Sequence, residues 1–90
     1  MLNELSTAIL LEVYKADQNP EQLLADVDAF DFSRDAKSYA LEVDHLKREC
    51  LIKGALVQDG PYGLGPVWAN ISLAHVTERG VDTLKELMLI

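Results

Sequence analysis

The stretch SRDAKSYALEVDHLKRECLI, residues Ser33–Ile52, decides how this chain folds. Its apolar residues recur at steps of three and four, which is the spacing of one helix face. They are Ala36, Tyr39, Ala40, Val43, Leu46 and Cys50. Ser33 is the expected N-cap, because its hydroxyl can accept a hydrogen bond from a free amide of the first turn. The stretch predicts a helix that buries this face and gives way to the apolar pair Leu51-Ile52, the start of an extended segment.

The first helix is expected to begin after Asn3 as N-cap and to run to about Lys15. Its core stripe contains Leu2, Leu5, Ile9, Val13 and Ala16. Leu10, Leu11 and Tyr14 lie outside that stripe, so the helix is apolar over more than one face. Such a helix is either deeply buried or makes a second contact, for example with another subunit. The interface expected for a homodimer contains Leu10, Leu11, Tyr14, Leu84 and Met88.

Two further helices are expected. Pro20 suits the first turn of a short helix over residues 21–27, and residues 26–32 then roughly alternate acidic with apolar side chains. Thr77 is the expected N-cap of a last helix from residue 78 to about residue 88. The inner face of this last helix is expected to contain Val81, Leu84 and either Leu87 or Met88.

A β-hairpin is predicted between the central and the last helix. Its strands are expected at residues 53–58 and 67–73, and the loop between them contains three glycines and two prolines. The loop lacks the Gly-Lys-Ser/Thr ending of a phosphate-binding P-loop, so a long hairpin turn is the simpler interpretation. Tyr62 near the tip can either touch a sugar-phosphate backbone or pack on the hairpin.

The order of these elements is that of a winged helix-turn-helix from its recognition helix onward. The predicted fold is therefore α+β and mainly helical: a single domain over residues 1–90 with a β-hairpin wing and a C-terminal helix. A chain of this length buries roughly two-thirds of the surface that it exposes when unfolded. No apolar run approaches the ~20 residues of a membrane span, and no early basic residue suggests a signal peptide. We expect a cytoplasmic protein.

The net charge of −7 limits the function classes. The segment before residue 33 contributes −6, residues 33–66 are neutral, and the remainder contributes −1. Nucleic-acid binding rests largely on the neutralisation of phosphates, so this balance argues against strong non-specific DNA binding. The acidic residues are nevertheless concentrated outside the part that would touch DNA.

The polar side of the central helix and the hairpin are a candidate nucleic-acid surface. Contacts to phosphates or base edges would come from Arg34, Lys37, Ser38, His45, Lys47, Arg48, Lys53 and Tyr62. Glu42 and Glu49 share this surface and would repel phosphate, and an ordinary solvated helix face is the alternative. Lys47, Arg48 and Lys53 can either grip backbone phosphates or complement the dipole at the C-terminal end of the helix.

The sequence offers no constellation for catalysis or metal binding. His45 and His75 are far apart, and no serine lies in the sharp-turn context of a nucleophile. Cys50 is the single cysteine, which excludes an internal disulfide and leaves too few ligands for a structural zinc site. Its place on the apolar face indicates a small core residue. We expect no enzyme activity, no metal and no cofactor.

Three stretches together resemble the YjcQ-like family of small winged-helix proteins: LSTAILLEVYKA (Leu5–Ala16), LKRECLIKGA (Leu46–Ala55) and VTERGVDTLKEL (Val76–Leu87). The resemblance implies a winged-helix fold and a bacterial or phage setting, without an established biochemical role. Winged helices of this kind usually have glycine where Cys50 stands, because the helix ends there in the left-handed conformation. Either Cys50 bears a strain of about 1 kcal/mol, or the helix ends differently and the hairpin leaves at another angle.

Two functional hypotheses follow. The first is a dimeric winged-helix protein that acts as a DNA-binding or transcription-associated factor, with the central helix in the major groove. The second is a protein-interaction module that kept the winged-helix core without DNA binding. The first requires a contiguous positive surface, and the second requires an exposed apolar patch, expected around Leu10, Leu11, Tyr14 and the last helix. Neither hypothesis involves a membrane.

Overall fold

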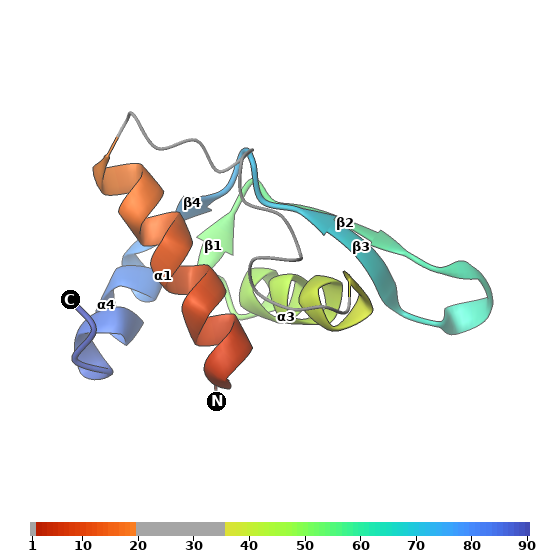
Figure 1. Ribbon diagram of the computed structural model, residues 1–90, viewed down its shortest axis with the longest axis horizontal. Coiled ribbons are helices and arrows are strands. Elements are labelled where there is room, and N and C mark those ends of the chain that lie inside the picture. The colour runs from red at the N-terminus through yellow and green to blue at the C-terminus, as the bar shows by residue number, and fades with distance from the viewer. Residues whose placement is uncertain (1, 20–35) are drawn as a thin grey trace.

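The computed structural model describes residues 2–19 and 36–90 and shows a small α+β arrangement, compatible with a winged-helix layout. The described elements, in chain order, are α1 (Glu4–Gln18), α3 (Ala36–Arg48), β1 (Ile52–Lys53), β2 (Leu56–Asp59), η2 (Pro61–Gly63), β3 (Pro66–Asn70), β4 (His75–Val76) and α4 (Glu78–Glu86). Three helices gather around β1 and β4, and the β2–β3 hairpin packs against α3 while its tip extends beyond the helices (Figure 1). None of the described helices is long and apolar enough to cross a membrane.

Four expectations fall outside the described residues. They are the short helix over residues 21–27, the alternating stretch over residues 26–32, the N-cap at Ser33 and the nucleic-acid contact from Arg34.

Helix α1 begins after Asn3, as the sequence predicts. The Asn3 side chain accepts a hydrogen bond from the Ser6 backbone N–H at 2.8 Å, and the Ser6 hydroxyl accepts one from the Asn3 backbone N–H at 2.9 Å. This reciprocal pair is a capping box. The helix continues to Gln18, three residues beyond the predicted end.

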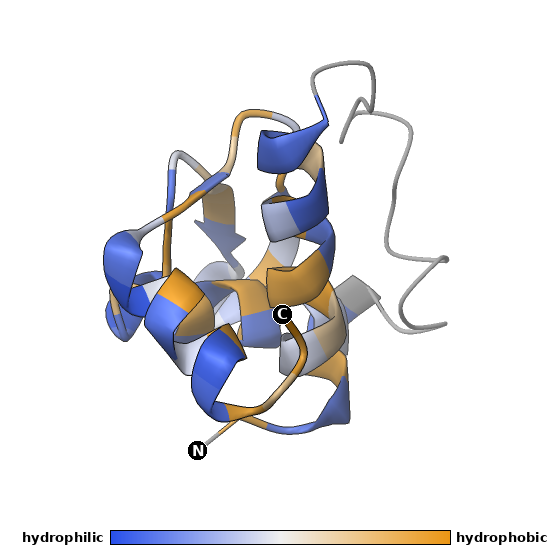
Figure 2. Ribbon diagram, turned by 90° about the vertical axis from the view of Figure 1, so that its left-hand side faces the viewer, coloured by the Kyte–Doolittle hydropathy of each residue, from blue (hydrophilic) through white to orange (hydrophobic). Residues whose placement is uncertain are grey.

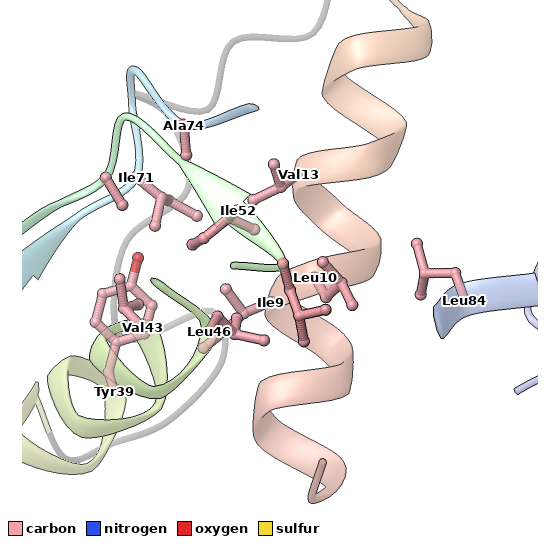
Figure 3. Packing of buried hydrophobic residues seen from close by; sticks show 12 residues of the cluster. Ile9, Leu10, Val13, Tyr39, Val43, Leu46, Ile52, Ile71, Ala74 and Leu84 are labelled. Carbon is pink, nitrogen blue, oxygen red and sulfur yellow. The ribbon is translucent and has the colours of Figure 1, made fainter. Parts of the chain in front are cut away.

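Helix α1 is apolar on two sides because it lies between α3 and α4 (Figures 1 and 3). Leu10 is wholly buried, as is Leu84 of α4. The prediction that these two side chains belong to a dimer interface is therefore wrong, because they have no surface to offer a partner. Leu11 and Tyr14 are partly buried against the core, and Met88 is 90% exposed, so Met88 is not on the inner face of the last helix.

The core is formed where α1, α3, β1 and the bend before β4 meet (Figure 3). Its members are Ile9, Leu10, Val13, Tyr39, Val43, Leu46, Leu51, Ile52, Ala55, Ile71, Ala74 and Leu84. The α3 residues predicted from their spacing to be buried, Tyr39, Ala40, Val43 and Leu46, are buried. This part of the sequence-based prediction is confirmed.

The end of α3 is a Schellman motif with a cysteine in the left-handed position. The Cys50 N–H donates to the Lys47 carbonyl and the Leu51 N–H to the Leu46 carbonyl, both at 3.0 Å. Cys50 has a φ of 59°. Of the two alternatives for this position, strained left-handed backbone is therefore the correct one. The expectation that Cys50 is a core residue is wrong, because it lies beyond the helix end and is exposed.

The N-terminal end of α4 packs against this end of α3. The Thr77 hydroxyl accepts from the Gly80 N–H at 3.0 Å and donates to the Cys50 carbonyl at 2.6 Å. The Thr77 N–H donates to the Leu51 carbonyl at 3.1 Å. A Cβ atom on Gly80 would collide with that carbonyl and with the Val76 side chain. The predicted N-cap is confirmed, and Gly80 is required because the helix approaches the backbone so closely.

The hairpin consists of two separate ladders, whereas the sequence predicts two continuous strands. β1 pairs antiparallel with β4, and β2 pairs antiparallel with β3. On one side the break lies at Gly54, whose φ is 83° and where a Cβ atom would collide with the Leu73 carbonyl. On the other side the Asn70 side chain accepts hydrogen bonds from the Ser72 N–H at 2.8 Å and from its hydroxyl at 2.5 Å, which turns the chain towards β4.

A second long-range contact ties the end of α1 to β4. One Asp17 carboxylate oxygen lies 2.8 Å from Nδ1 of His75, and the other accepts from the Val76 N–H at 2.8 Å. The C-terminal residues after α4 form the hydrophobic tail seen near the C label in Figure 2. Leu87, Met88, Leu89 and Ile90 are all exposed.

Replacing Cys50 by glycine should raise the free energy of unfolding by about 1 kcal/mol, because glycine adopts a positive φ without the steric penalty of a side chain. Urea denaturation checks this as a higher midpoint with an unchanged m-value. Cys50→Ala is the matched control, since alanine removes the thiol and keeps the strain. An equal gain in both variants would contradict the assignment of the strain to the backbone.

Gly80→Ala should lower the free energy of unfolding by about 1–3 kcal/mol, because the added methyl group overpacks against a backbone carbonyl that cannot rotate away. In an unobstructed helix the same change would stabilise by about 1 kcal/mol, so the sign of the effect is diagnostic. Asp82→Ala, at an exposed position of the same helix, is the control and should change little. Increased stability of Gly80→Ala in thermal denaturation would refute the close approach.

Candidate nucleic-acid interface

Two adjoining rows of side chains run along the exposed side of α3, because residues three and four apart share a helix face. The first, called the outer row, contains Lys37, Leu41, Asp44 and Arg48. The second, called the inner row, contains Ser38, Glu42, His45 and Glu49. From the sequence alone, both rows are predicted to belong to one polar surface. The structure separates them by the partners that each row has.

The inner row is turned towards α1 and α4. The Asn3 side-chain amide donates to a Glu42 carboxylate oxygen at 2.8 Å, and the Glu42 side chain is only 14% exposed. The Arg79 guanidinium of α4 lies 3.9 Å from Glu49. Glu42 therefore contacts the cap of α1, and the half-exposed Glu49 lies near Arg79 of α4.

His45 lies between these two carboxylates. Its Nδ1 is 3.8 Å from Glu42 and its Nε2 is 3.8 Å from Glu49. The second oxygen of Glu42 is buried and accepts no hydrogen bond from any described residue. His45 therefore sits within an acidic group on the side of α3 that faces α1 and α4, away from the centre of the outer row.

The outer row and the end of α3 are mainly cationic. Lys37, Lys47 and Arg48 are exposed, and Arg48 pairs with Asp44 at 2.9 Å. Exposed ion pairs of this kind contribute little stability, so Arg48 can exchange Asp44 for another anion at small cost. Leu41, which is 54% exposed, lies in the middle of the row. Lys53 is exposed on β1, so the outer row, the end of α3 and β1 carry four cations, against Asp44 and the half-exposed Glu49.

The hairpin has a different character. Tyr62 has a φ of 56° and is fully exposed at the tip, so it does not pack on the hairpin. Residues 54–74 contain no lysine or arginine, and Asp59 is their single charged residue. Leu56, Leu64 and Trp68 are large apolar side chains that this segment leaves exposed. The hairpin can therefore offer hydrogen bonds and apolar contacts, but no cation for a phosphate.

A groove of about 280 Å³ separates the inner row from α4. It is lined by Leu2, His45, Glu49, Leu51, Arg79, Thr83, Glu86 and Leu87. Its charged members are largely occupied with one another through the Glu49 contacts to His45 and Arg79. Within residues 2–19 and 36–90, no three His, Cys, Asp or Glu side chains gather in a way that could hold a metal ion.

Replacing Asn3 by alanine should lower the free energy of unfolding by about 1 kcal/mol or slightly more, because the cap is lost and the Glu42 carboxylate loses its donor. Asn3→Ser separates the two effects, since serine keeps the cap and lacks the amide that reaches Glu42. Urea denaturation should rank the wild type above Asn3→Ser and Asn3→Ser above Asn3→Ala. Identical stability of the wild type and Asn3→Ser would show that the Glu42 contact contributes nothing.

Comparisons of the chain with protein-family models, curated proteins and solved structures found no match. The candidate surface is therefore defined by the residues of this chain alone.

Proposed function

We propose that this chain is a winged-helix protein that binds double-stranded DNA and acts as a DNA-binding or transcription-associated factor. The observation that carries the proposal is the separation of the two rows on α3. Glu42 and Glu49 are engaged by Asn3 and Arg79, and the outer row is left with a cationic balance. This weakens the objection that Glu42 and Glu49 would repel phosphate, while the net charge of −7 still counts against DNA binding.

An α-helix such as α3 fits the major groove by its diameter. With its side chains a helix is about 10–12 Å across, and the groove is about 12 Å wide. In the proposed complex, Lys37 lies near the start of the helix, while Lys47, Arg48 and Lys53 lie at its exit and hold backbone phosphates. The order of helix, hairpin and C-terminal helix supports the winged-helix assignment. Membership of the YjcQ-like family, with its bacterial or phage setting, is proposed from the three sequence stretches that resemble it.

A protein-interaction module without DNA binding is the second candidate. Three observations favour it: the net charge of −7, the absence of lysine and arginine from residues 54–74, and the exposed Leu41 in the middle of the outer row. DNA-binding wings commonly add phosphate contacts, and this hairpin has no cation with which to do so. The two candidates differ in whether the chain has any affinity for DNA.

Titration of a labelled mixed-sequence duplex, followed by anisotropy, tests the first candidate. With four phosphate contacts the logarithm of the binding constant should fall against the logarithm of salt concentration with a slope of about −3.6. The double variant Lys47→Gln and Arg48→Gln should reduce this slope by about 2. Lys85→Gln, at an exposed position of α4, is the control and should leave it unchanged.

Selection from random duplexes complements the titration, because a sequence-specific protein can bind mixed DNA weakly. Absence of binding to mixed-sequence DNA at low salt, combined with failure to enrich any sequence, would eliminate the DNA-binding proposal. The protein-interaction module would then be the remaining candidate.

A further inference from the structure

The two faces of the β2–β3 ladder have opposite environments. Side chains alternate between the faces of a strand, and residues directly opposite each other share a face. Val57 pairs with Ala69, and both pack against the core. Leu56 and Trp68 therefore lie on the other face, where they are 52% and 45% exposed. Tyr62 and Leu64 lie beyond them near the tip and are also exposed, and we call these four side chains the hairpin patch.

We propose that the hairpin patch is a homodimer interface, in which it packs against the same patch of a second copy of this chain. In a two-fold symmetric contact a surface meets itself, so any net charge on it repels its own counterpart. The chain as a whole carries −7, of which −6 comes from the segment before residue 33. Residues 54–74 contain one charged residue, so this is the part that two copies can bring together with little repulsion.

The composition of the patch fits an interface. Tyrosine and tryptophan are enriched at protein contacts because they combine a large apolar area with a polar group. β2 and β3 pair only with each other, so each also presents an unpaired backbone edge in the described structure.

The alternative apolar surface is less suitable for self-association. The dimer contact predicted from the first helix fails because Leu10 and Leu84 are buried. The proposed dimer is independent of DNA binding, since it uses the hairpin and leaves the outer row of α3 free.

Sedimentation velocity over a concentration series tests the proposal, in parallel with intrinsic fluorescence. Trp68 is the single tryptophan of the chain, so its emission reports directly on the patch. Dimerisation should shift the emission to the blue and reduce acrylamide quenching, with the same concentration midpoint as the change in sedimentation. Leu56→Glu retains the fluorophore and should weaken association about tenfold or more, because it places two like charges in the contact.

Leu41→Glu is the matched control, since Leu41 is equally exposed but lies on α3. It should leave both measurements unchanged. Tyr62→Glu is the second patch variant and should also weaken association; its fully exposed side chain can be replaced without disturbing folding, which circular dichroism verifies. A monomer at every concentration up to near-millimolar overturns the proposal. A dimer that persists in both patch variants, with unchanged Trp68 emission, overturns it as well.

Discussion

The backbone of Leu51 is the point on which the described structure depends. Its amide closes α3 by bonding to Leu46, its side chain enters the core, and its carbonyl receives the Thr77 amide at the start of α4. Ile52 follows at once and pairs with Val76, so the β1–β4 ladder begins at the same corner. A helix end, a strand start and a helix start thus share one residue. The absent side chain of Gly80 makes this possible, because it allows α4 to reach the carbonyl.

The parts of the fold that follow from local pattern could be predicted. The buried face of α3 repeats every three or four residues, and the caps at Asn3 and Thr77 act within one helical turn. The sequence left open whether Leu10 is buried inside the protein or makes a second contact, because this depends on α1 lying between two helices that are far away in the sequence. The contact of Asp17 with His75 joins residues 58 apart in sequence, and no local pattern indicates it.

The candidate nucleic-acid surface could likewise be predicted only in part from the sequence. Spacing alone places Glu42, Glu49, Lys37 and Arg48 on one polar side of a helix, and the sequence therefore predicts a surface of mixed charge. The positions of Asn3 and Arg79 divide that side into two rows, and both come from other elements. The sequence likewise predicts the hairpin strands without showing which face the core covers. Only the pairing register places Trp68 on the uncovered face.

The two ladders of the hairpin have a mechanical consequence. β1–β4 and β2–β3 are separate sheets, and the connection between them lies at Gly54 on one strand and at the Asn70–Ser72 turn on the other. Ala55 and Ile71, next to this connection, are buried in the core. The direction of the tip therefore depends on the backbone angles at this connection and on the packing of Val57 and Ala69 against the core. Substitutions that re-aim the tip must preserve that packing.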